Sequence, residues 1–357
     1  MGRPATRSRI ARALGRAGSS ATRLWWRIRA RHPLDSRTVS LDRATLDDVY
    51  SCYRLFLQRT PDAVGFGAYA AQVERGLSVR DLVSYFVGCP EWIRRELYKT
   101  PANTSLARVG TSDFELYVLE ADPVVARELI HTGAYEPHVA GRIRSRLGPG
   151  DVFVDVGANV GYYTLLASRL VGPTGKVLAF EPNQANVKVL MLNRLHNRCD
   201  NVTIYPFAAS REEGLLALMK IVSIASTKEP TEDDLRYLNA ADMVYATTLD
   251  RVLATEPRVD VIKCDIDGHD FLAMQGASRT LATRRPVVFA EFNPGTLKEF
   301  SRIDPIEYLR LFVASDYRID VLLRSGELVA CGSDCQRVMA LFADGSVDQV
   351  DLMLLPA

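Results

Sequence analysis

Short, almost continuous apolar runs alternate with helical stretches in the second half of the chain. Five of these runs predict strands, and the helical stretches lie between or after them. Strands that are apolar throughout are typical of a parallel sheet covered by helices on both faces. We therefore predict an α/β fold with a central, mostly parallel sheet. The predicted strands are 151–156, 176–181, 202–206, 259–265 and 286–291, and the predicted helices are 161–171, 183–196, 268–281 and 304–314.

Residues 211–250 interrupt this alternation. The run GLLALMKIVSIAS predicts an extra hairpin, and the polar stretch after it indicates an excursion over the edge of the sheet. Beyond residue 317, shorter apolar runs could close the sheet with antiparallel strands. Ahead of the alternation, residues 103–147 predict a strand at 113–119 followed by two helices.

Residues 41–98 predict several short helices. Val49, Tyr53, Phe56 and Leu57 fall on one helical stripe, and Ser78 is placed to cap a later helix. We expect a small all-α domain at 41–100, followed by the α/β domain at 101–357.

Charge is unevenly distributed along the 357 residues, although the formal net charge is only +1. Nine arginines and no acidic residue lie in residues 1–34, so the remainder carries a net charge of −8. A mildly acidic body gives no reason to expect a nucleic-acid partner. The basic arm, 1–40, is either a flexible tail or a membrane-surface helix, since Trp25 and Trp26 stand beside Arg27 and Arg29.

Six cysteines have neither the spacing of a zinc site nor that of a small disulfide framework. No run approaches the ~18–20 apolar residues of a transmembrane helix, and the arm lacks the apolar core of a signal peptide. We expect reduced thiols and a cytoplasmic protein, with peripheral contact at the inner membrane face as the alternative offered by the arm.

A glycine turn follows the first predicted strand in VDVGANVGYYT. The dinucleotide fingerprint GxGxxG is incomplete here, because its middle glycine is missing, and Asp155 would repel a diphosphate. A phosphate-free cation such as S-adenosylmethionine suits the carboxylate better. Gly157 would let a ligand approach the backbone, Gly161 would allow close packing, and Glu181 in AFEPN is placed to accept ribose hydroxyls.

An acidic cluster, KCDIDGHD, follows the fourth predicted strand. Methyl transfer needs an acceptor oxygen aligned with the methyl group and usually a base, for which Asp265, Asp267 and His269 are the candidates. Lys263 is expected to bind the acceptor or to pair with a neighbouring acid. The other interpretations are a helix cap at Asp267 or Asp270 and a Mg²⁺ site, although we predict no metal.

Glu291 ends the fifth predicted strand at the same edge, where it would line the acceptor pocket. The remaining histidines are isolated along the chain and are expected to be surface or packing residues. They are His32, His131, His138 and His196.

The segments VDVGANVGYYTLLASRLVGPTGKVLAFEPNQANVKVLMLN, NVTIYPFAAS, TTLD and VDVIKCDIDGHDFLAMQGA resemble the FkbM-type methyltransferase family over about residues 130–295. This resemblance implies a class I methyltransferase, Rossmann-like fold that uses S-adenosylmethionine, usually to methylate sugar or polyketide hydroxyls. Glu136 matches a family element ahead of the turn and would bind the acceptor. The implied cofactor contacts are Asp155, Gly157, Ala158, Asn159, Gly161, Glu181, Pro182, Asn183, Phe207 and Ala208.

A second resemblance concerns the helical region. YRLFLQRTPDAVGFGAYAAQVERG is similar to a small helical domain of unknown function that is attached to glycan-modifying enzymes. Together the two resemblances imply an S-adenosylmethionine-dependent O-methyltransferase acting on a glycan, a glycolipid or a related natural product. The alternatives are an NAD(P)-dependent oxidoreductase and a non-catalytic, cofactor-binding scaffold of a glycan-assembly complex.

Overall fold

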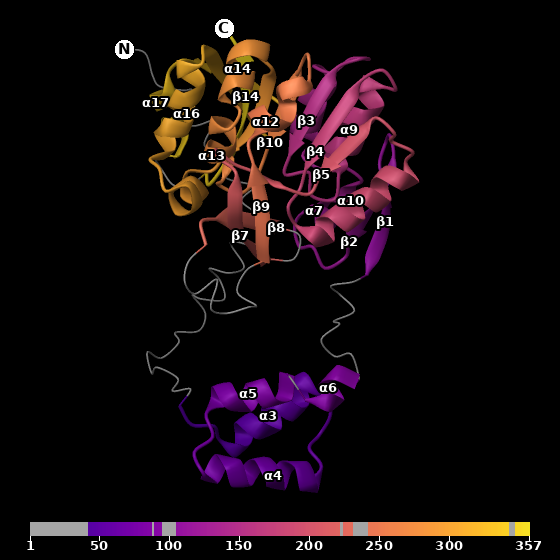
Figure 1. Cartoon of the computed structure of the whole chain (residues 1–357), viewed down its shortest axis with the longest axis vertical. Helices are drawn as coiled ribbons and strands as arrows, with labels where there is room; N and C mark the ends of the chain where they lie inside the picture. Colours follow the sequence, from indigo (N-terminus) through magenta and orange to yellow (C-terminus); the bar gives the residue numbers. More distant parts are fainter. Residues whose placement is uncertain (1–41, 88, 95–104, 222–223, 231–241, 343–346) are drawn as a thin grey trace, which may run out of the picture. The chain divides into compact units, whose positions relative to one another are not determined.

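The computed structural model describes residues 42–87, 89–94, 105–221, 224–230, 242–342 and 347–357 (Figure 1). The described residues form two compact units, a helical unit that ends before residue 106 and a larger unit, Leu106–Ala357. The basic arm predicted at 1–40 lies outside the described residues.

The helical unit contains α3 (Leu46–Phe56), α4 (Ala63–Glu74), α5 (Val79–Val87) and α6 (Pro90–Arg94). A capping box starts α3, because the Thr45 hydroxyl accepts from the Asp48 amide and the Asp48 carboxylate accepts from the Thr45 amide. The stripe predicted for this helix is buried at Val49, Tyr53 and Leu57. The Ser78 hydroxyl accepts from the Asp81 amide and caps α5 as predicted.

The larger unit is built on an eight-stranded sheet with the strand order β13-β12-β14-β11-β10-β3-β4-β5. Its parallel part runs from β11 to β5, and all five predicted strands lie in it. The last three strands close the sheet antiparallel, which confirms the expectation for the tail. The bounds are β3 (Val152–Val156), β4 (Lys176–Phe180), β5 (Val202–Tyr205), β10 (Val261–Cys264), β11 (Val287–Phe292), β12 (Tyr317–Leu322), β13 (Leu328–Gly332) and β14 (Val350–Pro356).

Two apolar cores cover the two faces of this sheet. Along β3, Val152, Val154 and Val156 enter one core with α13, α14 and α16, whereas Phe153 enters the other with α7, α8 and α9. Figure 1 shows α16 and α17 at one end of the larger unit and α10, β1 and β2 at the other. The helices are α7 (Val125–Thr132), α8 (Pro137–Arg144), α9 (Tyr162–Val171), α10 (Gln184–His196), α12 (Leu249–Val252), α13 (Asp270–Gln275), α14 (Ser278–Arg284), α15 (Pro294–Thr296), α16 (Pro305–Ala314) and α17 (Cys335–Met339), with short turns η2 (Leu253–Thr255), η3 (Leu297–Ser301) and η4 (Ala340–Phe342).

The helix predicted at 268–281 is broken in two. A Cβ at Gly276 would lie 2.0 Å from the Ser210 carbonyl oxygen, so the end of α13 packs directly on another segment's backbone. The new helix, α14, then receives its cap from outside, because the Asp250 carboxylate accepts from the amides of Arg279 and Thr280. Neither contact can be predicted from the periodicity of the sequence.

Two small sheets accompany the large one. The predicted hairpin exists as β7 (Gly214–Ile221) and β8 (Ile224–Lys228), within a four-stranded sheet of order β6-β9-β7-β8. The sequence did not reveal β6 (Ala208–Ala209) or β9 (Asp242–Thr247). The single strand predicted at 113–119 is one arm of an antiparallel pair, β1 (Leu106–Gly110) and β2 (Glu115–Leu119).

No helix among the described residues is long and apolar enough to cross a bilayer. All six cysteines are free thiols, in agreement with the expectation of reduced cysteines.

Asn193 provides the first testable prediction. Its fully buried amide accepts from the Tyr117 amide at 2.6 Å and donates to the carbonyls of Tyr117 and Val160 at 2.9 and 2.7 Å. It therefore ties β2 to the loop ahead of α9. Asn193→Ala leaves these backbone groups unpaired and should lower the free energy of unfolding by about 2–4 kcal/mol.

Scanning calorimetry is the appropriate measurement, because all three tryptophans precede residue 106 and do not report on the larger unit. Gln184→Ala, at an exposed position of the same helix, is the control and should leave the transition in place. Equal transition temperatures for the two variants would contradict the role given to Asn193.

Candidate active site

The candidate site residues meet because of strand direction and side-chain alternation. The carboxyl ends of β3, β10 and β11 share one edge, at the point where the strand order reverses between β3 and β10. Asp155, Lys263 and Glu291 have the same alternation as Phe153, Val261 and Phe289, which face the core under α7–α9. They therefore lie on one face of the sheet.

The glycine turn is held by the neighbouring strand. The amides of Gly157 and Ala158 both donate to the Phe180 carbonyl, at 3.0 and 2.9 Å. A Cβ at Gly157 would lie 2.0 Å from the Asp265 carbonyl oxygen, and φ is +85° there. Gly157 therefore makes room for the backbone that follows β10, and its expected contact with a ligand stays a prediction.

Gly161 does serve close packing, as expected. A Cβ there would lie 2.4 Å from Leu190 Cδ1, so the start of α9 is pressed against α10. The left-handed φ of +98° also favours glycine at this position.

Glu181 connects the turn to the start of α10. Its two carboxylate oxygens accept from the amides of Asn159, at 2.8 Å, and Asn183, at 2.7 Å. The side chain is buried, and burial raises the pKa of Glu181 to about 7. The Asn186 side chain is a third hydrogen-bond donor to this carboxylate, which leaves one lone pair to accept from a ligand hydroxyl.

Two buried polar atoms beside Glu181 have no hydrogen-bond partner among the described residues. One is Asn183 Nδ2, whose amide oxygen already caps α10 by accepting from the Ala185 amide. The other is Asp155 Oδ1, in a carboxylate whose second oxygen accepts from the Thr164 hydroxyl at 2.6 Å. Burial raises the pKa of Asp155. A donor and an acceptor thus stand unpaired next to the turn, as expected of a ligand site.

Lys263 is the buried cation of the site. Its Nζ lies 2.9 Å from Asp265 Oδ2 and 4.7 Å from the centre of the Tyr163 ring. Burial would lower the pKa of Lys263, but the carboxylates of Asp265, Asp155 and Glu136 together raise it above its usual value. The side chain is only 6% exposed and forms the ion pair with a neighbouring acid that was one of its two expected roles, while its contact with the acceptor stays a prediction.

Glu136 reaches the same cluster from the N-cap of α8. Its Oε2 accepts from the Tyr163 hydroxyl at 2.8 Å, and its backbone has a left-handed φ of 41°. Burial, followed by the carboxylates of Asp351 and Asp265, raises the pKa of Glu136. The residue is half-buried and remains a candidate for acceptor contact.

The antiparallel strand β14 adds residues that the sequence did not reveal. Its Asp351 is the register partner of Glu291 on β11, and its Oδ2 lies 2.8 Å from His138 Nε2. His138 was expected to be a surface or packing residue, and its contact with Asp351 could not be foreseen because β14 comes from the far end of the chain. Burial raises the pKa of Glu291 well above its usual value, and Asp265 and Asp267 add to the shift.

The loop after β10 separates the acidic candidates. Asp267 is half-buried with a left-handed φ of 51°, and burial, with Asp265 and Asp270 nearby, raises its pKa to about 7. Asp270 accepts from the amides of Ile266 and Gly268. Asp270 therefore holds the loop ahead of α13 and does not cap the helix, whose start has no side-chain cap. Burial raises its pKa to about 6.

His269 does not face this cluster. Its side chain is 1% exposed, and its Nε2 lies 3.1 Å from the Ser210 hydroxyl oxygen, beside the small sheet. Burial lowers the pKa of His269 to about 4. We therefore withdraw His269 as the candidate base, because an acceptor cannot reach an enclosed ring.

The last cofactor candidates lie beyond β4 and β5. Pro182 is buried next to Glu181, and the Phe207 ring packs edge-on against Tyr245 at 5.6 Å. Ala208 is 3% exposed and packs in the core of the four-stranded sheet, and its expected adenine contact stays a prediction. Among the described residues, no group of three or more histidine, cysteine or acidic side chains is arranged to hold a metal ion.

The fold and the glycine turn define a class I methyltransferase. Residues 155–319 match the family model described as the methyltransferase FkbM domain. The glycine turn, Glu181 and the acidic loop after β10 all lie within the match. The chain is therefore a methyltransferase that uses S-adenosylmethionine.

Solved structures are similar to the chain at low identity. A methyltransferase FkbM from Methylobacillus flagellatus KT is 13% identical, with 94% of this chain and 71% of that chain covered and a TM-score of 0.38. A SAM-dependent O-methyltransferase from Thermotoga maritima is 14% identical, with 74% and 81% covered and a TM-score of 0.37. A search of curated proteins gave no significant match. The assignment rests on the family match, because these TM-scores are low.

The residues at the turn fit S-adenosylmethionine. Glu181 has a lone pair left for a ribose hydroxyl, and the unpaired Asp155 Oδ1 can accept from the ammonium of the methionine part. The oxidoreductase alternative has no support, since the match is to a methyltransferase domain.

Glu181 also predicts a pH dependence of stability. Its pKa of about 7 in the folded chain exceeds the ~4.3 of an unperturbed glutamate, so the folded state binds more protons between these values. Stability should fall as the pH rises through that window. Glu181→Gln removes this carboxyl and should flatten the slope by at most about 1.4 kcal/mol per pH unit.

The measurement is a series of calorimetric unfolding curves between pH 4.5 and pH 7.5. Glu327→Gln, at an exposed position, should reproduce the wild-type slope. If Glu181→Gln also reproduces it, the raised pKa of Glu181 is wrong.

Proposed function

We propose that this chain methylates a hydroxyl of a glycan, a glycolipid or a related natural product. The observation that carries the proposal is the position of Asp265. Its backbone touches the glycine turn at Gly157, and its Oδ2 is held by the buried Lys263 ammonium. Its Oδ1 has no partner among the described residues and is free to accept a hydrogen bond from a hydroxyl.

The chain's own residues account for two requirements of the reaction. Asp265 orients the acceptor hydroxyl, and positioning of this kind can supply roughly 7–11 kcal/mol of the barrier reduction. Asp267, with a pKa of about 7, is suited to take the hydroxyl proton near neutral pH. When bound, S-adenosylmethionine supplies the methyl group.

The rest of the rim favours a polyhydroxylated acceptor. Glu136 and Glu291 are half-buried and lie within electrostatic reach of Asp265. Carboxyl groups on several sides can accept from several hydroxyls at once, which suits a sugar. The resemblance of the helical unit to a domain attached to glycan-modifying enzymes supports the same acceptor class.

A cytoplasmic location without a nucleic-acid partner belongs to the same proposal. Its support is the set of free cysteines and the mildly acidic body. The second candidate function is a non-catalytic scaffold. The family that the sequence resembles more often has glutamate at the positions of Asp267 and Asp270, and this difference is the reason to consider it.

Calorimetric titration tests the donor side. S-adenosylmethionine and S-adenosylhomocysteine should bind with micromolar affinity, and NADH should not bind. Glu181→Ala should weaken both interactions more than tenfold, because the ribose loses its acceptor; Glu327→Ala serves as the matched control. Unchanged affinity in Glu181→Ala would refute the ribose role, and binding of NADH alone would refute the donor assignment.

Methyl transfer to a glycan panel tests the acceptor side. Asp265→Asn keeps the size of the side chain but loses the carboxylate, and should lower kcat at least a hundredfold with little change in cofactor affinity. Asp200→Asn, at an exposed position, is the control. Full activity in Asp265→Asn would refute its role, whereas cofactor binding without transfer to any acceptor would favour the scaffold.

A further inference from the structure

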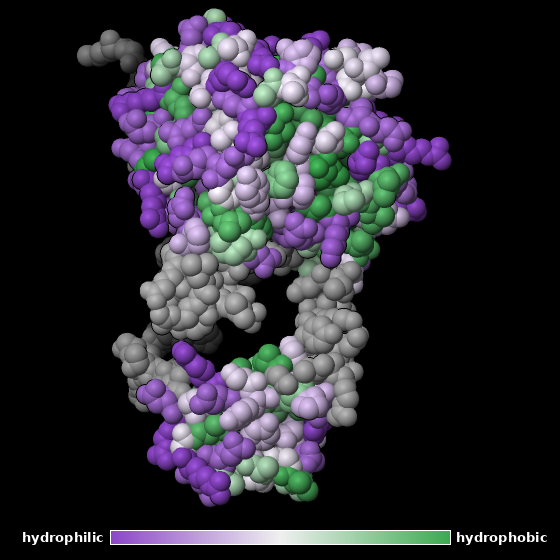
Figure 2. Space-filling view, in the orientation of Figure 1, coloured by the Kyte–Doolittle hydropathy of each residue, from purple (hydrophilic) through white to green (hydrophobic). Residues whose placement is uncertain are grey.

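The outer face of α10 is unusually apolar. The helix buries Val187, Leu190 and Asn193 against the sheet, yet Met191, Leu192 and Leu195 on its other side are 50%, 36% and 68% exposed. Their spacing places them on one helical face. Figure 2 shows a hydrophobic patch over α10 at the right of the larger unit. We call these three side chains the α10 ridge.

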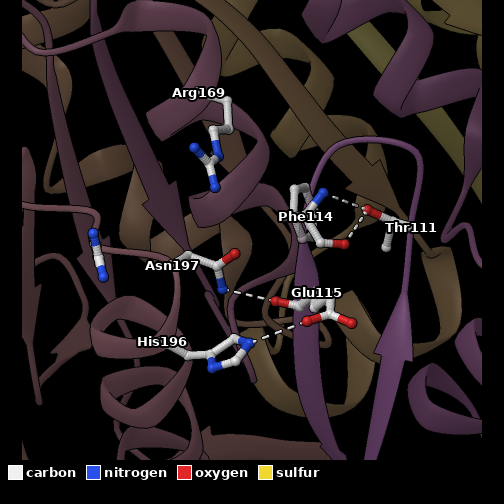
Figure 3. Close-up of a pocket in the computed structure, with 7 residues that line it drawn as sticks. Thr111, Phe114, Glu115, Arg169, His196 and Asn197 are labelled. Atoms are coloured by element: carbon white, nitrogen blue, oxygen red, sulfur yellow. Dashed lines mark hydrogen bonds and ion pairs between the residues drawn. The ribbon is translucent and has the colours of Figure 1, made fainter.

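A hollow of about 570 Å³ opens at the C-terminal end of this helix. Figure 3 shows Arg169, from α9, on the other side of the hollow from His196 and Asn197, with Phe114 and Thr111 of the β1–β2 hairpin beside them. The lining residues are Thr111, Phe114, Glu115, Arg169, His196, Asn197 and Arg198.

The hollow carries more positive than negative charge. Within the described part of the chain, Arg169 and Arg198 form no ion pair, although Asp113, which pairs with Arg144, lies within electrostatic reach of Arg169. The one acid in the lining, Glu115, is already shared between Arg108, at 3.9 Å, and His196, at 3.4 Å. Two guanidinium groups are therefore available to an anion, and guanidinium matches the geometry of phosphate.

We propose that the α10 ridge and this hollow dock on an anionic lipid bilayer. The ridge would enter the headgroup boundary, while Arg169 and Arg198 would bind lipid phosphates from the hollow. Apolar side chains on one helix face with arginines beside them are the composition of an interfacial helix. A soluble anion would use the arginines alone and would leave the ridge exposed to water.

The basic arm supplies a second reason to choose a bilayer. Nine arginines lie in residues 1–34 of the same chain, and stable peripheral binding generally takes two signals. Each basic residue near an anionic surface strengthens binding further.

Docking here leaves the donor site free. The 13 residues of α10 span about 20 Å, from Asn183 beside Glu181 to the hollow beyond His196. Cofactor affinity is therefore an independent test of whether a variant remains folded, and the inference does not depend on the identity of the acceptor.

The experiment is sedimentation of the full chain with vesicles of phosphatidylcholine, with and without phosphatidylglycerol. Wild type should bind the anionic vesicles only. The double variant Arg169→Glu/Arg198→Glu and the single variant Leu195→Ser should each weaken that binding about tenfold or more and retain wild-type affinity for S-adenosylhomocysteine. Arg318→Glu, exposed on β12, is the matched control and should bind as wild type does.

Three results would overturn the proposal. The first is unchanged vesicle binding in both hollow and ridge variants, which would assign all binding to the arm. The second is binding of inorganic phosphate that depends on Arg169 and Arg198 in a chain that does not bind vesicles. This result would make the hollow a soluble-anion site. The third is a concentration-dependent dimer abolished by Leu195→Ser in the absence of lipid, which would assign the ridge to a second copy of the chain.

Discussion

The candidate site depends on the interactions of the buried Lys263 ammonium with the groups around it. The ammonium lies against Asp265 and over the Tyr163 ring, and the carboxylates of Asp155 and Glu136 also raise its pKa. A cation removed from water is stable there only because several carboxylates surround it. The same cation lets those acids gather at one edge of the sheet, where their mutual repulsion would otherwise oppose folding.

Close packing makes the donor and acceptor sides one rigid unit. Gly157 lies where any side chain would strike the backbone of Asp265, so the glycine turn and the loop after β10 hold each other in place. Glu181 extends this unit, because its carboxylate accepts amides from both the turn and the start of α10. Preorganisation of this kind keeps a methyl donor and a hydroxyl in fixed positions.

The ends of α10 have different chemistry, which follows from its place in the fold. Its first residues stand at the carboxyl edge of the sheet beside Glu181, and its last residues reach the hollow lined by Arg169 and His196. A single helix thus connects the donor site with the hollow that Arg169 and Arg198 line. In an α/β protein the two ends of such a helix necessarily lie at opposite edges of the sheet.

Local pattern alone determined the five parallel strands, the closing antiparallel tail, the glycine turn and the acidic loop, because each depends on residues close together in sequence. Tertiary structure alone decided the pairing of His138 with Asp351, the burial of His269 against Ser210 and the break at Gly276. Each of these depends on a partner brought in by a distant strand or loop. Periodicity records which face of an element is buried, but it does not record what lies against that face.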